Sequence, residues 1–377
     1  MHFSELLTAL GVPSLKSLTN VHYSTLEECS IQNLFTIDRL GWLLNQPDIF
    51  KSLRLSMNHA DLNPYDVNIN NNIRLIQLLN HLSKGASCIL HNAELRDYLL
   101  HKLCHDGEVL TGAPINCNIY LTPSGEKAFP PHTDPHDVIV VQIAGAKRWF
   151  IESTSQPVCT YDMHPGNILL VPRGVIHHAE SLESQTPYSL HLTFGFFQPT
   201  LDDIVGELAR QSQTSKNDLV YGTKPYKFDS IDFFSALDTE SSILNKLSKI
   251  QSQLARDKDL IQRTMYKLRS DLIDSMKISF DGALGSVLQL RHKNGIDYCT
   301  KLKVTSNPFS LVEKNGATCI HTKYSNTIIP FPYRLVSSIL SRPESFSIAD
   351  LHSDNEKELL LIVCNLLLKR ALLLLHP

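Results

Sequence analysis

Residues 130–143 read Pro130-Pro-His-Thr-Asp-Pro-His-Asp-Val-Ile-Val-Val-Gln-Ile143, a polar turn followed by an unbroken apolar run. A short apolar run bounded by turn residues is typical of a buried strand. On extended backbone, side chains two positions apart share a face, so His132 and Asp134 can converge on one point while Thr133 points away. The stretch therefore predicts a strand that begins with two potential metal ligands.

A third potential ligand follows a second strand-like run. Residues 166–171 lead into the turn Pro172-Arg-Gly174, and His177 comes three positions later. The turn would reverse the chain and direct His177 inward. Two imidazoles and one carboxylate form the facial triad of non-haem Fe(II) oxygenases, which leaves coordination sites open for a cosubstrate and O₂.

The pattern could also arise by chance, or a neighbouring histidine could be the ligand instead. The chain has 17 histidines, so a His-x-Asp pair alone is a weak signal. His136 could replace His132, but it has Val138 where the carboxylate would be needed. His178 could replace His177, but it would point away if His177 points inward. We therefore expect His132, Asp134 and His177 to be the metal ligands.

A buried cation is the next requirement of such a site. Fe²⁺ with this triad carries a net positive charge, and 2-oxoglutarate would add a distal carboxylate that needs a partner inside the protein. Lys147 follows the turn Gly145-Ala146, and alternation places Lys147 and Trp149 on one face with Arg148 on the other. A surface lysine is the ordinary alternative. The bulky neighbour Trp149 favours an inward Lys147 that binds the cosubstrate.

Short apolar runs bounded by turn residues recur through the central part of the chain and predict a β-sandwich or barrel. They are Ser87–Leu90, Cys117–Leu121, Val138–Ile143, Arg148–Ile151, Ile168–Val171 and Leu190–Phe197. Before them, the apolar spacing predicts helices at residues 37–44 and 73–82.

Beyond residue 200 the pattern becomes helical. Apolar residues at steps of four and three predict a long helix with an apolar seam, interrupted at Asp257. The seam consists of Ile243, Leu247, Ile250, Leu254, Ile261, Met265, Leu268 and Leu272. It either packs within its own domain or forms a homodimer interface. The last hundred residues read as strands, two helices (333–340 and 356–369) and a closing strand (371–375), an order that resembles a winged helix.

Composition excludes several broad classes. With 377 residues, 42% hydrophobic and 19% charged, the chain is expected to be globular. A formal charge of -3 and little clustered basic charge near the C-terminus argue against nucleic-acid binding. No secretory signal begins the sequence, and Lys369 and Arg370 interrupt its most apolar stretch, so we expect no membrane association. Eight scattered cysteines without CxxC spacing indicate reduced thiols and a cytoplasmic protein.

Five segments together resemble one family, the JmjC-type (cupin-like) ribosomal oxygenases, which are Fe(II)- and 2-oxoglutarate-dependent protein hydroxylases. The segments are Asn118-Ile-Tyr120-Leu-Thr-Pro-Ser-Gly125, Pro131-His-Thr-Asp134, Val141-Gln-Ile-Ala-Gly-Ala-Lys147-Arg-Trp149, Val171-Pro-Arg-Gly-Val-Ile-His177 and His191-Leu-Thr193-Phe-Gly195. Detailed agreement covers about residues 116–197; beyond it the similarity is architectural.

The resemblance implies a role for each matching residue. His132, Asp134 and His177 would bind iron, and Lys147 would pair with the distal 2-oxoglutarate carboxylate in a pocket lined by Thr193. It also places two residues near the cosubstrate and the substrate side chain, Asn118 and Tyr120. One departure concerns Gly195: the histidyl hydroxylases of the family have a hydroxyl residue there, two positions after the threonine, so this chain lacks a substrate-contacting hydroxyl at that position.

The resemblance also implies a mixed α+β architecture in three parts. These are a double-stranded β-helix (cupin, JmjC jelly roll) catalytic domain with N-terminal helices at 1–200, a helical dimerisation segment at 201–276 and a winged-helix-like domain at 277–377. The implied activity is hydroxylation of a protein or peptide side chain, with His or Arg of a ribosomal protein favoured. The alternatives are hydroxylation of a peptide natural-product precursor and a catalytically silent cupin that acts as a protein-binding dimer; methyl-lysine demethylation fits less well.

Overall fold

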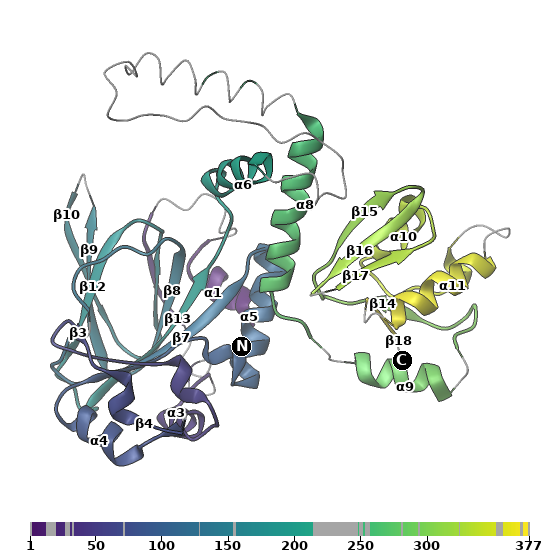
Figure 1. The fold of residues 1–377 in the computed structure, drawn as a ribbon. Coiled ribbons are helices and arrows are strands. Elements are labelled where there is room, and N and C mark those ends of the chain that lie inside the picture. Colours follow the sequence, from purple (N-terminus) through teal and green to yellow (C-terminus); the bar gives the residue numbers. More distant parts are fainter. Residues whose placement is uncertain are drawn as a thin grey trace. The chain divides into compact units, whose positions relative to one another are not determined.

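The computed structural model has a strand-rich first unit and a mixed second unit (Figure 1). The first comprises Met1–Gln198 with Met276–Leu284, and the second Pro199–Ser275 with Gly285–Pro377. The structure describes residues 2–12, 20–26, 31, 34–70, 72–127, 129–153, 156–213, 248, 252, 257–279, 282–292, 295–323, 325–351, 357–369 and 372–375. Among the helices so described, none is both long and apolar enough to cross a membrane.

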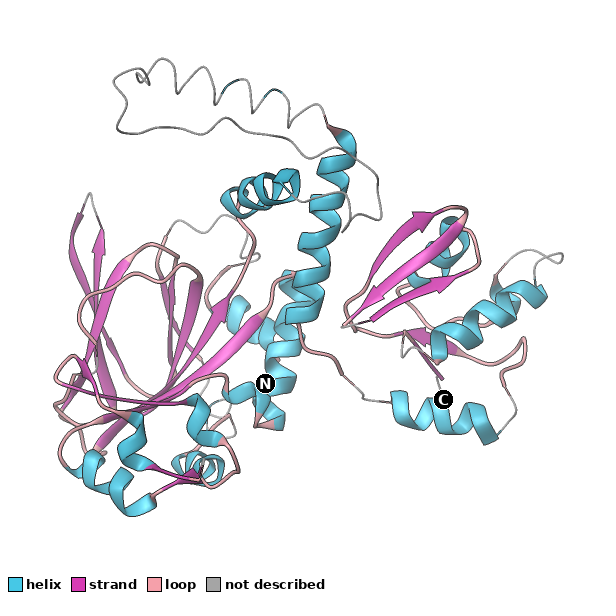
Figure 2. Cartoon of the chain, viewed as in Figure 1, coloured by secondary structure: helices cyan, strands magenta, loops and turns pink. Residues whose placement is uncertain are grey.

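Two antiparallel sheets form the framework of the first unit, as Figure 2 shows. The larger sheet has the strand order β1 (His22–Thr25), β11 (Asn167–Val171), β8 (Asp137–Ala144), β13 (Tyr188–Phe196), β7 (Ile115–Pro123), β6 (Ser87–Leu90), β2 (Leu53–Met57) and β3 (Ala60–Asp61). The smaller sheet has the order β10 (Gln156–Met163), β9 (Ala146–Ser153) and β12 (Ile176–Leu182). All six strands predicted from apolar runs are confirmed.

Alternation along β7 separates a core face from a cavity face. Cys117, Ile119 and Leu121 point into the main hydrophobic core, whereas Asn118 and Tyr120 line a cavity. The core face of the sheet is covered by helices that include α1 (Phe3–Ala9) and α5 (Tyr98–Thr111). Burial of each large apolar side chain in this core stabilises the fold by about 1.5–3 kcal/mol.

The passage from the larger to the smaller sheet depends on a glycine. Gly145 joins β8 to β9 with φ of +65°, and a Cβ at this position would lie 1.9 Å from the carbonyl oxygen of Tyr188. No side chain is compatible with that approach, so the turn requires glycine. The turn sets the register of β9 and thereby the inward direction of Lys147 and Trp149, both of which are buried.

The first unit also contains helices that the apolar spacing of the sequence predicted. The predicted helix at 37–44 is confirmed as α3 (Ile37–Leu44), whose N-terminus is capped by the Thr36 side chain accepting a hydrogen bond from the Arg39 amide. The helix predicted at 73–82 is α4 (Leu75–Ser83). Short elements between and after them are η1 (Ile49–Ser52), η2 (Pro64–Val67), β4 (Asn68–Ile69), β5 (Asn72–Ile73) and η3 (Ala93–Leu95).

The second unit contains helices and two small sheets. Its helices are α6 (Leu201–Gln213), α8 (Lys258–Ser275), α9 (Ala283–His292, which begins in the first unit), α10 (Tyr333–Leu340), η5 (Ile348–Asp350) and α11 (Lys357–Leu368). Its sheets pair β14 (Leu302–Val304) with β18 (Leu373–Leu375), and β15 (Ser310–Lys314) with β16 (Ala317–Thr322) and β17 (Ser325–Ile329). The strands and helices predicted for the last hundred residues are present, while the winged-helix interpretation and the three domain boundaries stay predictions.

Only part of the predicted apolar seam lies within the described residues. Ile243, Leu247, Ile250 and Leu254 fall outside them. Helix α8 carries the remaining four positions, Ile261, Met265, Leu268 and Leu272, all of which are half-buried. In the same unit α6 packs against α8.

A buried ionic cluster in the first unit joins Lys277 to Glu94 and Glu108. Lys277 Nζ lies 3.1 Å from Glu108 Oε1 and 3.5 Å from Glu94 Oε1, and it also donates to the carbonyl oxygen of Ile115. All three ionic side chains are at most 7% exposed. Burial raises the pKa of Glu94 although Lys277 opposes this effect. For Lys277, burial is outweighed by Glu108 and Glu94, so its pKa is raised.

Lys277→Met is expected to lower the free energy of unfolding by about 2–3 kcal/mol, because it leaves two buried carboxylates without their cation. Removing one partner of a buried ion pair typically costs about 3–5 kcal/mol. We expect a smaller loss here because Glu94 can take up a proton in the variant. Urea unfolding at neutral pH measures the effect. The matched control is Lys267→Met, which removes an exposed pair with Asp271 and should cost less than about 1 kcal/mol. Equal losses in the two variants would contradict the role of the cluster.

Candidate active site

A cavity of about 520 Å³ lies between the two sheets of the first unit. Its walls come from β7, β8, β9, β12, β13 and the loop that precedes β8. Every residue assigned to the site from the sequence lines this cavity: His132, Asp134, His177, Lys147, Thr193, Asn118 and Tyr120.

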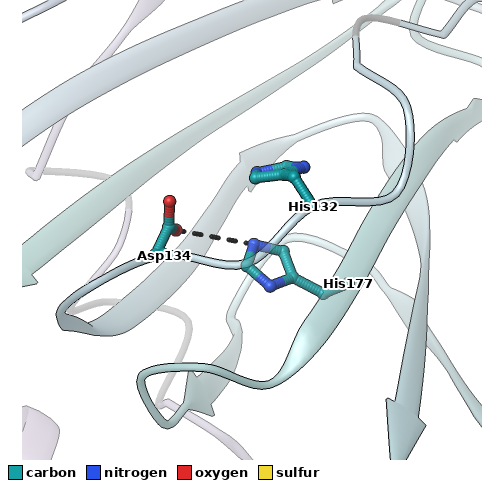
Figure 3. Close-up of side chains that lie close together, drawn as sticks. All are labelled: His132, Asp134 and His177. Atoms are coloured by element: carbon teal, nitrogen blue, oxygen red, sulfur yellow. Dashed lines mark ion pairs between the residues drawn. The ribbon is translucent and has the colours of Figure 1, made fainter. Parts of the chain in front are cut away.

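The three potential metal ligands, all of which line the cavity, lie close together (Figure 3). One ligand atom from each of His132, Asp134 and His177 lies within 4.8 Å of the other two. His177 Nε2 and Asp134 Oδ2 are 3.5 Å apart. His177 is buried, Asp134 is half-buried and His132 is exposed, so the cluster is open on one side.

The secondary structure predicted for His132 and Asp134 is wrong. They lie in the loop before β8 rather than in a strand. The loop is held instead by a β-bridge in which the His132 amide donates to the His177 carbonyl (3.1 Å) and the His177 amide donates to the His132 carbonyl (2.9 Å). This long-range pairing, rather than alternation within one strand, brings the two histidines together.

Hydrogen bonds to the backbone determine which ring nitrogens are free. His132 Nδ1 lies 2.9 Å from the Pro130 carbonyl oxygen, and His177 Nδ1 lies 2.9 Å from the Val175 carbonyl oxygen. A carbonyl oxygen can only accept, so each Nδ1 donates, and Nε2 is the ring atom left to bind a metal. Both rings are therefore oriented and polarised as metal-binding imidazoles are.

Asp134 supplies the negative charge of the cluster. Burial opposes its ionisation, but the hydrogen bond and charge of His177, with smaller contributions from His136 and His132, lower the pKa of the carboxyl below its usual value. A carboxylate and two imidazoles, with one ligand atom of each lying close to the other two, fit a divalent transition metal such as Fe²⁺, which would displace any proton from the ligand nitrogens.

Lys147 is a buried amine in the lining of the cavity. It is 2% exposed, and its Nζ donates to Thr122 Oγ1 at 3.2 Å. Ser87 Oγ in turn donates to the same Thr122 oxygen. Burial lowers the pKa of Lys147 from 10.5 to about 7. Among the described residues no ion pair offsets this cost, so an anionic ligand would find an uncompensated cation site.

His191 and Thr193 lie on the same face of β13, and both line the cavity. The sequence did not predict a role for His191 in the site. Its ring stacks on Tyr120 with centroids 4.7 Å apart. Burial, reinforced by Lys147, lowers its pKa well below the usual value, so the ring is neutral. The sequence could have indicated this role, because His191 lies two residues before Thr193 and alternation along a strand places both side chains on the same face.

Asn118 and Tyr120 form the wall contributed by β7. Asn118 Oδ1 accepts a hydrogen bond from the Asn92 amide at 3.0 Å. Burial, with the nearby charge of Asp134, raises the pKa of Tyr120 to about 12, so its hydroxyl remains protonated. Arg54 and Phe129 also line the cavity, and the Arg54 guanidinium lies over the Phe129 ring, 4.4 Å from its centroid. The sequence carried no signal for either residue.

The JmjC domain family model matches residues 101–204. The bifunctional lysine-specific demethylase and histidyl-hydroxylase NO66 of Dictyostelium discoideum is 27% identical over 210 residues, which are 50% of this chain and 40% of that protein. Ribosomal oxygenase 2 of Rattus norvegicus is 29% identical over 206 residues, 49% of this chain and 43% of that protein. The chain thus spans less than half the length of these two curated relatives.

Solved structures share the fold over nearly the whole chain. A structure of YcfD, a ribosomal oxygenase from Escherichia coli, in complex with cobalt and succinic acid, matches with a TM-score of 0.53. The match covers 94% of this chain and 95% of that chain at 14% identity. Another YcfD structure, in complex with cobalt and 2-oxoglutarate, gives a TM-score of 0.51 with the same coverage and identity. At this identity the likeness shows a common fold.

Proposed function

Because the chain belongs to the JmjC ribosomal oxygenase family, we propose that it is an Fe(II)- and 2-oxoglutarate-dependent oxygenase that hydroxylates a side chain of a protein or peptide. The observation that carries the proposal is the joint presence, in one cavity, of the converged His132–Asp134–His177 cluster and the buried Lys147, which makes no ion pair with any residue that the structure describes. One feature binds a metal and the other binds an acid.

The proposed reaction balances without further reactants. 2-Oxoglutarate, O₂ and a substrate C–H bond give succinate, CO₂ and a C–OH bond, with one oxygen atom of O₂ in succinate and the other in the product. Iron supplies the activation of O₂ when it is bound. We assign His132, Asp134 and His177 as its ligands, with three coordination positions left for small molecules.

The remaining residues bind, orient and keep water out. Protonated Lys147 pairs with the distal carboxylate of 2-oxoglutarate, and Thr122 and Thr193 offer hydroxyl groups beside it. Asn118 and Tyr120 lie between this pocket and the substrate side. Trp149 lines the cavity and belongs to a buried apolar cluster with Val140, Ile151, Met163 and Leu169, so this wall would help to keep water from the cosubstrate.

The leading substrate is a His or Arg side chain of a ribosomal protein, by similarity to relatives named ribosomal oxygenase and histidyl-hydroxylase. We also propose a cytoplasmic homodimer whose C-terminal winged-helix-like part contacts protein rather than nucleic acid. These finer assignments rest on the sequence patterns and on the family.

Anaerobic absorption spectroscopy with Fe(II) and 2-oxoglutarate tests the proposed function. The chain is expected to give a visible metal-to-ligand charge-transfer band that His132→Ala loses and that Lys147→Ala shows only at higher 2-oxoglutarate concentration. A folded, iron-replete chain without the band would contradict the proposal and favour another metal or a catalytically silent binding protein.

The dimer has its own test. Replacing both Leu254 and Ile261 with Glu places charges in the apolar seam, and is expected to convert a dimer to a monomer because two copies would bury four carboxylates. Light scattering measures the mass. A mass unchanged by the double replacement would exclude the seam as the interface.

A further inference from the structure

One edge of β7 is completed by side chains instead of a neighbouring strand. Strand β6 pairs with the middle of β7 and, among the described residues, with none of those at its start. There the Ile115 amide donates to Glu108 Oε1 at 2.9 Å, and the Cys117 amide donates to Glu94 Oε2 at 2.8 Å. The Ile115 carbonyl oxygen accepts from Lys277 Nζ. Buried backbone groups need such partners, so these three side chains take the place of a strand.

Glu94 links this edge to the wall of the cavity. It lies in η3 and is 2% exposed. Two residues before it, at the start of η3, the Asn92 amide donates to Asn118 Oδ1 at 3.0 Å. Asn118 follows Cys117 on β7 and lines the cavity, whereas Cys117 points into the core. Glu94 therefore ties η3 to β7 through Cys117, and this connection helps to hold Asn92 beside the Asn118 side chain.

We infer that Glu94 is a positioning residue for the proposed hydroxylation, because it holds η3 against β7 and thereby orients Asn118 in the cavity. This inference rests on the proposed function. Glu94 does not itself line the cavity, so it would act through Asn118 and not on the reacting groups. A reversed Asn118 carboxamide would direct its own N–H groups at the Asn92 amide, so this bond fixes which atom Asn118 offers to the cavity.

Lys277 connects this arrangement to a distant part of the chain. Its Nζ lies 3.5 Å from Glu94 Oε1, and its charge opposes the rise that burial causes in the pKa of Glu94. The Lys277 amide donates to Glu108 Oε2 at 2.5 Å, and His105 Nδ1 lies 3.2 Å from the Lys277 carbonyl oxygen. The segment that follows α8 is thus bound through its backbone as well as its side chain, and it supports the position of Glu94.

Hydrogen exchange, resolved to single amides by mass spectrometry, tests the positioning without a substrate. In the unchanged chain, the Cys117 amide should exchange as slowly as that of Leu121, which lies opposite Cys88 of β6. Glu94→Leu removes an acceptor, so exchange at Cys117 and Asn92 should rise at least about tenfold while Leu121 stays protected. Glu94→Gln keeps an acceptor oxygen for the Cys117 amide and should keep both amides protected.

The ratio of oxidised peptide to succinate tests the functional step. The probes are peptide pools with degenerate flanks and a central His or Arg, supplied with Fe(II), 2-oxoglutarate and O₂. Glu94→Leu should keep the charge-transfer band, because the metal ligands and Lys147 are unchanged, but should give about tenfold less oxidised peptide per succinate because Asn118 is displaced. Glu94→Gln should keep the ratio. The matched control is Glu183→Leu, which replaces an exposed glutamate outside the cavity.

A double variant tests whether Glu94 acts through Asn118. Asn118→Ala is expected to lower the same ratio at least about tenfold. Adding Glu94→Leu to Asn118→Ala should lower it no further, since two residues that act in series are not additive. Independent, additive losses would overturn the assigned route through Asn118.

The outcomes separate this inference from the proposed function. Unchanged exchange at Cys117 and Asn92 in Glu94→Leu, or an unchanged ratio in that variant, overturns the inference. If Glu94→Leu does not fold, fast exchange of Cys117 in the unchanged chain overturns it, and slow exchange there with an unchanged ratio in Glu94→Gln supports it. If neither pool is oxidised, the exchange at Cys117 and Asn92 decides. A chain with neither the charge-transfer band nor succinate release would overturn the proposed function, and the inference with it.

Discussion

Asp134→Ala is expected to abolish iron-dependent succinate release while the chain stays folded. Asp134 is the one carboxylate of the cluster, so its loss leaves two neutral imidazoles facing a divalent ion. Iron affinity should fall by more than about a hundredfold, since even changes in the partners of metal ligands cost 10–100-fold. The fold should survive because Asp134 lies in a loop with its side chain 30% exposed. Succinate release and iron titration measure the two effects.

A matched carboxylate outside the cavity provides the control for this variant. Asp162 pairs with Arg148 on an exposed part of the smaller sheet. The Asp162→Ala variant should bind iron and release succinate as the unchanged chain does. Full activity in the Asp134→Ala variant would contradict the assignment of Asp134 as a metal ligand.

Lys147→Met is expected to weaken 2-oxoglutarate binding at least about a hundredfold and yet to stabilise the empty chain. The first effect follows because the distal carboxylate would be buried without a cation. The second follows because methionine fills a similar volume without a buried amine, which we expect to add about 1–3 kcal/mol to the free energy of unfolding at pH 7. Ligand titration and chemical unfolding measure the two changes.

The pH dependence of this effect has a definite sign. Burial lowers the pKa of Lys147 from 10.5 to about 7, so between these values the unfolded chain binds more protons than the folded one. Stability of the empty chain should therefore rise with pH from about 7 to about 10, and the advantage of Lys147→Met should shrink over that range. Above pH 7, 2-oxoglutarate binding must take up a proton, so its affinity should decline.

An exposed lysine is the control for both measurements. Lys51→Met, with a side chain 66% exposed in the wild type, should change neither 2-oxoglutarate affinity nor the pH profile. Tight 2-oxoglutarate binding in Lys147→Met would contradict the assigned cation site.

Within residues 87–197, local sequence patterns predicted most of the strands and the direction of two site residues. The apolar runs predicted the strands, the turn at Gly145 and the alternation after it placed Lys147 inward, and Pro172-Arg-Gly174 placed His177 at the start of β12. These features depend on φ, ψ preferences and on the two-residue period of a strand. Both act over a few positions, so they can be read from sequence alone.

Contacts between distant segments could not be read in this way. His132 lies in a loop, and its β-bridge to His177, rather than alternation within a strand, brings the two ligands together. The same holds for the insertion of Lys277 between Glu94 and Glu108, and for the His136 ring that fills the space beside Gly195. Strand register and packing across the two sheets create these contacts, and they depend on how the whole core is filled rather than on any short stretch of residues.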